Sequence, residues 1–72
     1  MIINPGFLPF DTCEVISWHG SYRGRHWCLW AKLRDGTMRF ITCKNNSVQM
    51  LEFIDKIKYE GYDYYEDRKK TL

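Results

Sequence analysis

Two β-rich runs, residues 26–34 and 37–43, flank the dipeptide Asp35-Gly36. Such a dipeptide between strands is a strong hairpin signal, because Gly favours positive φ and Asp tolerates it. Residues 14–20 have the composition of a further strand, and Ser21 to Gly24 are predicted as the loop that follows it. We therefore expect a three-stranded antiparallel sheet over residues 14–43.

Beyond the hairpin the apolar spacing becomes helical. Asn46 suits a helix N-cap, and Gly61 suits the position just after a helix end. The apolar positions between them are Val48, Leu51, Ile54 and Ile57, widened by Met50 and Phe53. The pattern predicts a helix over Ser47–Glu60 and an α+β fold in which three strands precede one packed helix.

The organisation predicted is a single domain of 72 residues. It comprises an N-terminal arm (1–13), the sheet (14–43), the helix (46–60) and a charged C-terminal tail (61–72). No apolar run is long enough to cross a membrane, and the first ten residues lack the basic start of a signal peptide. With three cysteines and no secretory signal, we expect a cytoplasmic domain with reduced thiols and no membrane partner.

A two-residue turn at Asp35-Gly36 would fix the pairing of the hairpin. Lys32 would face Arg39, Trp30 would face Ile41, and Cys28 would face Cys43. One face of the hairpin would then be apolar and meet the helix: Trp27, Leu29, Ala31, Leu33, Met38, Phe40 and Thr42. The other, called the outer face below, would hold His26, Cys28, Trp30, Lys32, Arg34, Arg39, Ile41 and Cys43.

Charge is concentrated in the same segment. The net charge is only +2, but residues 17–44 contain six Lys or Arg side chains against one acidic residue, Asp35. The predicted Lys32–Arg39 pair is a like-charge pair, which a bound anion would relieve. A tryptophan among cations on an open sheet suits base stacking or phosphate contact. The alternative is that the cations are simply solvated and that Trp30 lies under the arm.

Four stretches carry a family resemblance: Tyr22–Arg25, Trp30–Gly36, Arg39–Ile41 and the helix start at Asn46-Ser47. Over residues 22–58 the sequence resembles the AP2-type DNA-binding domain and is similar to the arm-binding domains of tyrosine recombinases. Those families place the helix-free face of a three-stranded sheet in the major groove of DNA. The resemblance implies DNA contacts by Arg23, Arg25, Trp30, Lys32, Arg34 and Arg39, and His26 shares the outer face with them.

A second hypothesis is a small protein-binding or inhibitory protein of phage or mobile-element type that acts on a host protein. Its interface anchors would be Trp30, Ile41, Tyr62, Tyr64 and Tyr65, since Trp, Tyr and Arg dominate interface hot spots. The acidic and aromatic tail fits this hypothesis better than DNA binding. A homodimer closed by the outer face is a third possibility. We place nucleic-acid binding slightly ahead of protein binding.

The sequence offers little for catalysis. The residues His19, His26, Cys13, Cys28 and Cys43 lack the spacing of a zinc site. Cys28 and Cys43 are expected as cross-strand neighbours, for which small thiols in the packing are the simplest explanation. No triad order, phosphate-binding loop or carboxylate pair stands out. We expect no enzymatic activity, no cofactor and no metal.

Overall fold

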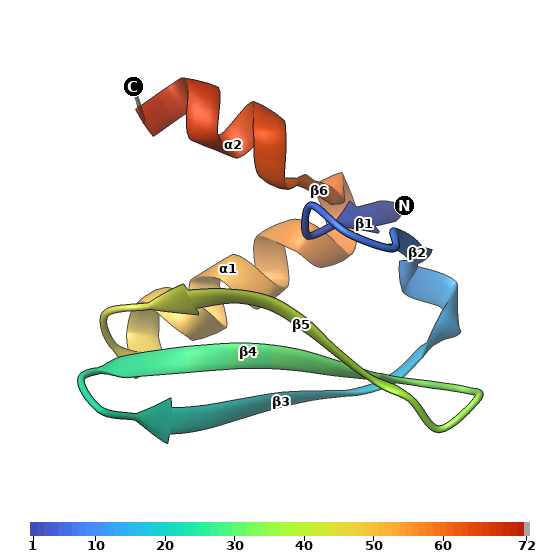
Figure 1. Ribbon diagram of the computed structural model, residues 1–72, viewed down its shortest axis with the longest axis horizontal. Coiled ribbons are helices and arrows are strands. Elements are labelled where there is room, and N and C mark those ends of the chain that lie inside the picture. Colours follow the sequence, from blue (N-terminus) through green and yellow to red (C-terminus); the bar gives the residue numbers. More distant parts are fainter. Residues whose placement is uncertain (72) are drawn as a thin grey trace.

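The computed structural model describes residues 1–71, with side chains for residues 1–69 (Figure 1). The predicted α+β fold, a three-stranded antiparallel sheet followed by a helix, is confirmed. The elements in chain order are β1 (Ile2–Asn4), β2 (Phe10–Asp11), a 3-10 turn (Thr12–Glu14), β3 (Val15–Arg23), β4 (His26–Leu33), β5 (Met38–Lys44), α1 (Ser47–Glu60), β6 (Tyr62–Asp63) and α2 (Tyr64–Thr71).

Helix α1 has the predicted bounds because both of its ends are capped. The Asn46 Oδ1 accepts a hydrogen bond from the Gln49 N–H at 2.8 Å. Gly61, at φ +74°, donates its N–H to the Ile57 carbonyl. The helix covers one face of the β3-β4-β5 sheet (Figure 1) and buries Met50, Ile54 and Ile57 against it.

The predicted apolar stripe of α1 is wrong at two positions. Val48 and Leu51 are exposed, at 61% and 59% of their full accessibility. The helix instead presents Met50, Ile54 and Ile57 to the sheet, which follow the i, i+4, i+7 spacing of one helical face. Apolar residues therefore lie on two neighbouring faces of this helix, and its packing against the sheet determines which face is buried.

The β3–β4 hairpin contains the two-residue turn of this fold. Strand β3 continues to Arg23, which pairs with His26, so the prediction that Ser21–Gly24 form a loop is wrong. Only Gly24 and Arg25 lie between the strands. Gly24 has φ +61° at the first turn position, where tight hairpins require a positive φ.

The turn between β4 and β5 has three residues, not two. The Leu33 N–H donates to the Thr37 carbonyl, and the Gly36 N–H donates to the Leu33 carbonyl. Arg34, Asp35 and Gly36 therefore form the loop, and of these only Gly36 has a positive φ, +89°. This is the pattern of a type I turn closed by a left-handed glycine. Hydrogen bonds from the side chain and the backbone of Thr37 lower the pKa of the Asp35 carboxyl.

Strand β5 is consequently shifted by one residue over its first half. Lys32 pairs with Met38, Ala31 with Arg39, and Trp30 with Phe40. The pairing shifts again between Leu29 and Trp30, where Ile41 is the extra residue of a β-bulge. From there the predicted register holds, with Leu29 opposite Thr42 and Cys28 opposite Cys43.

This shift reverses the side-chain directions of residues 38–40. The predictions that Lys32 faces Arg39 and that Trp30 faces Ile41 are wrong. Met38 and Phe40 lie on the outer face beside Trp30, and Arg39 lies on the helix side with Ala31. Ile41 belongs to the core, where it is only 2% exposed.

The predicted arm and tail form a second, small sheet of order β2-β1-β6. Strand β1 pairs antiparallel with β2, and parallel with β6 through Ile3–Tyr62 and Asn4–Asp63. Helix α2 follows β6 directly and projects away from the large sheet (Figure 1). The Asp63 Oδ1 caps this helix, accepting from the N–H groups of Tyr65 and Glu66. Leu72 lies outside the described residues.

The core joins the two sheets and α1. Its buried members are Ile3, Phe10, Leu29, Ala31, Leu33, Ile41, Met50, Ile54 and Ile57. Ile3 and Phe10 come from the small sheet, so the segment predicted as an arm supplies part of the core. Phe10 brings an aromatic ring to the interior, while Phe40 points out.

Gly61 is the position at which substitution should cost most. A Cβ built there would lie 2.7 Å from the Ile2 carbonyl oxygen, and φ is +74°. We predict that Gly61→Ala lowers the free energy of unfolding by about 2–3 kcal/mol. Gly24→Ala, with φ +61° but open space around the new Cβ, should cost about 1 kcal/mol. Denaturant titration compares the two, and an equal or larger loss for Gly24→Ala would contradict the packing at Gly61.

Candidate binding surface

Apolar and aromatic side chains occupy the middle of the outer face. The Trp30 and Phe40 rings meet edge to face, with their centroids 5.3 Å apart. Phe40 is 45% exposed and Met38 is 46% exposed. On β3 the same face carries Ser17, His19, Ser21 and Arg23, placed there by their pairing with β4. The outer face is therefore an apolar strip with polar and cationic borders.

The side chains predicted to bind nucleic acid are divided by the fold. His26, Trp30 and Lys32 lie on the outer face, as expected. Arg23, which was predicted in a loop, lies on the same face at the end of β3. Arg25 lies in the β3–β4 turn. Arg34 lies in the β4–β5 turn, where its Nε donates to the Cys13 carbonyl at 3.2 Å. Arg39 lies on the opposite face, so the predicted cluster of Lys32 with Arg39 does not form.

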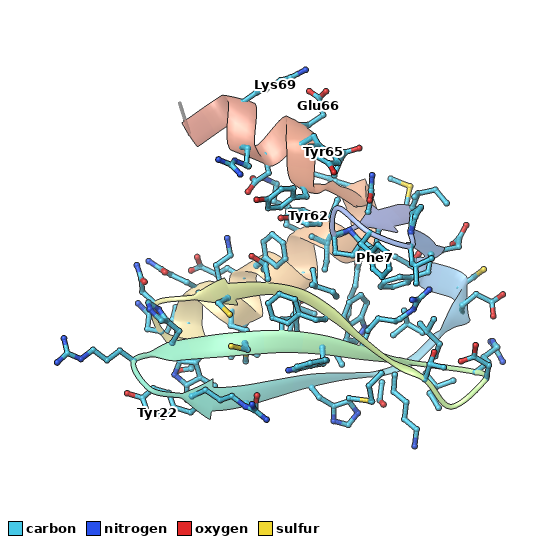
Figure 2. All side chains as sticks on the ribbon, viewed as in Figure 1. Phe7, Tyr22, Tyr62, Tyr65, Glu66 and Lys69 are labelled. Atoms are coloured by element: carbon cyan, nitrogen blue, oxygen red, sulfur yellow. The ribbon has the colours of Figure 1, made fainter. Side chains whose placement is uncertain are left out.

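The side chains predicted to anchor a protein partner are divided as well. Ile41 is buried, and only Trp30 belongs to the outer face. Tyr62 instead lies in β6 of the small sheet, and Tyr64 and Tyr65 begin α2, which follows β6 directly. Figure 2 labels Tyr62 and Tyr65 in this part of the molecule. Tyr62 packs edge to face on Phe53, and its burial is the main cause of the raised pKa of its hydroxyl. Tyr65 donates to the Gly6 carbonyl, which fastens the tail to the arm.

A hollow of about 330 Å³ opens between the arm and β5. We call it the arm–strand hollow; its lining residues are Pro5, Phe7, Leu8, Trp30, Met38, Arg39 and Phe40. Phe7 is 76% exposed and Leu8 is 51% exposed, which adds two large apolar side chains to those of β5. Figure 2 shows Phe7 in the loop between β1 and β2, beside the large sheet. The apolar strip of the outer face thus continues across the edge of the sheet to the arm.

Arg39 is the charged member of the hollow. Its guanidinium carbon lies 5.8 Å from the centroid of the Phe10 ring, a cation–π contact. Its Nε is buried and has no hydrogen-bond partner among the described residues. A buried N–H without a partner costs about 1–3 kcal/mol.

The backbone at Leu8 is in an unusual conformation. Its φ is +50°, and it is the one non-glycine residue with positive φ in the described chain. The left-handed region costs a branched, non-glycine residue about 1–2 kcal/mol. Strain of this kind persists where the surroundings impose it, and it is enriched at ligand-binding positions. At Leu8 it turns a large apolar side chain toward solvent beside Phe7.

The polar chemistry of this face is modest. The Ser17 hydroxyl and the His19 Nε2 are 2.7 Å apart, and the Cys28 and Cys43 sulfur atoms are also 2.7 Å apart. Within the described residues, no three His, Cys, Asp or Glu side chains gather in a group that could hold a metal ion.

Sequence reasoning did not find four residues of the hollow. Phe7 and Leu8 were assigned to an arm tucked against the fold, and Met38 and Phe40 were assigned to the core face. The signal for the last two is that Asp-Gly also fits a three-residue hairpin turn with glycine at the left-handed position, and this turn would place both side chains outward. No comparable local signal marks Phe7 and Leu8.

No protein-family model, curated protein or solved structure matches this chain. The resemblance to AP2-type and recombinase arm-binding domains accordingly stays a prediction from the sequence. Neither helix in the part of the chain that the structure describes has the length and apolarity of a membrane span.

Substitutions at two adjacent residues test the side-chain directions on β5. Ile41→Ala should lower the free energy of unfolding by about 2–4 kcal/mol, because it leaves a cavity in the core. Phe40→Ala should cost about 1 kcal/mol or less, because much of the ring is already in water. Thermal or denaturant unfolding measures both. The opposite ranking would restore the two-residue turn and the predicted register.

Proposed function

We propose that this protein is a protein-binding domain that engages its partner with the arm–strand hollow and the adjoining strip of the outer face. The observation that carries the proposal is the exposed apolar cluster of Phe7, Leu8, Met38 and Phe40 around a half-buried Trp30. Burying one such side chain fully is worth about 1.5–3 kcal/mol. Contiguous exposed apolar surface of this kind is typical of interaction sites.

The charges around the cluster define the partner's chemistry. Residues 15–34 and 36–44 contain no Asp or Glu. Lys32 borders Met38 across the ladder, and Arg39 lines the hollow with a buried Nε that has no hydrogen-bond partner among the described residues. We therefore infer a partner segment in which an apolar side chain stands next to a carboxylate. The apolar group would fill the hollow, and the carboxylate would accept hydrogen bonds from Arg39.

Nucleic-acid binding has less support from this arrangement. Of the basic side chains predicted to bind nucleic acid, the outer face carries Arg23, His26 and Lys32. Arg23 and His26 form a pair at the start of β4, and Lys32 lies near its end, with the apolar strip between them. Lys32 lies six positions along the strand from His26, a span of about 20 Å. Phosphate contacts would have to come from those ends, while Phe40 and Met38 would face the bases or the backbone. Arg39, which the predicted register placed on the outer face with Trp30, is on the other face.

The test is a selection from a displayed library of random peptides with the full-length protein, followed by titration of a labelled selected peptide. Selected peptides should combine aromatic or aliphatic residues with Asp or Glu. Phe40→Ala and Arg39→Gln should each weaken binding about tenfold or more, which corresponds to about 1.4 kcal/mol. Leu51→Ala, an exposed apolar position on α1, is the matched control and should leave binding unchanged.

Leu8→Gly separates binding from stability. Glycine adopts a positive φ without strain, so the free energy of unfolding should change by less than about 1 kcal/mol. Binding should nevertheless weaken, because the side chain is lost from the rim of the hollow. Peptide binding that the substitutions at Phe40, Arg39 and Leu8 leave unchanged would contradict the proposal. So would a protein that binds duplex DNA in a salt-sensitive manner and selects no peptide.

A further inference from the structure

Cys28 and Cys43 form a pair that the proposed function does not use. They are directly opposite each other on the antiparallel strands β4 and β5, and their sulfur atoms are 2.7 Å apart. Cys43 is exposed, and Cys28 is partly exposed. Both side chains lie on the outer face, away from α1. A small thiol-reactive molecule can therefore reach the pair without unfolding the domain.

The backbone at this pair already has the geometry of a cross-strand disulfide. Opposed residues on antiparallel strands have Cα atoms about 4.5–5.5 Å apart, within the range that a disulfide spans. A sulfur–sulfur bond is about 2.0 Å long, so the two atoms need to approach by less than an ångström. The bulge at Ile41 is what brings the two cysteines into register. Without the bulge, the three-residue turn would place Cys28 opposite Thr42.

We propose that Cys28 and Cys43 are a modification site that closes to a reversible intramolecular disulfide. With a small-molecule disulfide as oxidant, one cysteine thiolate attacks the disulfide and releases one thiolate of the oxidant. The second cysteine thiolate then attacks the protein sulfur of the mixed disulfide and releases the other. Two cysteine thiols are oxidised, the oxidant is reduced to two thiols, and the two protons pass to them.

The environment of the pair sets how fast it reacts. Burial and the contact with Cys28 raise the pKa of Cys43 to about 11. The thiolate is the reactive form, so exchange should be slow at neutral pH and should accelerate as the pH rises. Ser21 pairs with Cys28 on the other side and has a buried hydroxyl without a partner in the described residues.

Cys13 provides an internal control. It is exposed, as Cys43 is, but it lies in the 3-10 turn before β3 and has no sulfur neighbour among the described cysteines. An oxidant that acted on any accessible thiol would modify Cys13 as readily as the pair. A reaction directed by geometry would link Cys28 to Cys43 and leave Cys13 outside the linkage.

The experiment uses the full chain, reduced and then incubated with oxidised glutathione at several pH values. Free thiols are blocked, and trypsin is added without reductant. Cleavage after Arg25, Lys32, Arg39 and Lys44 isolates Cys28 in residues 26–32 and Cys43 in residues 40–44. We expect these two peptides joined, with the loss of two hydrogen atoms, and Cys13 free or carrying glutathione. The thermal midpoint of the oxidised monomer should rise by several degrees, and dithiothreitol should reverse the shift.

Variants complete the test. Cys28→Ser and Cys43→Ser should each leave a glutathione adduct on the remaining cysteine of the pair, and Cys13→Ser should leave the linkage intact. The proposal is overturned if both cysteines of the parent protein keep stable glutathione adducts. It is also overturned if Cys13 joins either of them as often as they join each other, or if the linked peptides come only from a covalent dimer.

Discussion

The pairing of β4 with β5 depends on one constraint: each strand must leave one residue out of the hydrogen-bonded ladder. Arg34 leaves β4 to enter the turn, and Ile41 leaves β5 to form the bulge. The 3-10 turn before β3 holds this turn in place, because the Arg34 N–H donates to the Glu14 carbonyl and the Arg34 Nε donates to the Cys13 carbonyl. Between the turn and the bulge, the side chains of β5 point to the opposite faces from those that the two-residue turn predicted. That stretch is residues 38–40, and its reversal places Phe40 outside, Arg39 inside and Ile41 in the core.

The rest of the molecule is consistent with this reversal. Phe10 from the small sheet is buried beneath Arg39, so the interior has an aromatic ring without Phe40. The small sheet in turn is closed by β6 and by the contact of Tyr65 with Gly6. The surface hollow exists because Phe40 and Met38 face out next to the arm. The same bulge that buries Ile41 aligns Cys28 with Cys43, so the candidate surface and the thiol pair have one structural origin.

Local signals predicted the parts of the fold that local chemistry decides. Caps at Asn46 and Gly61 gave the bounds of α1, and strand composition gave the three strands. The hairpin register was predicted wrongly over residues 38–40 because Asp-Gly fits turns of two or three residues. The choice rests on contacts of Arg34 with residues about 20 positions earlier. The pairing of β1 with β6 joins segments nearly 60 residues apart, and no local pattern encodes it. Of the predicted site residues, Trp30 and Lys32 therefore lie where expected, while Arg39 and Ile41 do not.

The most direct measurement is a set of proton–proton NOEs across the hairpin in the labelled protein. The reversal of residues 38–40 predicts contacts between the side chains of Trp30 and Phe40, between Lys32 and Met38, and between Arg39 and the Phe10 ring. It predicts none between Trp30 and the Ile41 side chain. Strong NOEs from Trp30 to Ile41 and from Lys32 to Arg39 would contradict it, and both the hollow and the direction of every side chain from Met38 to Ile41 would have to be abandoned.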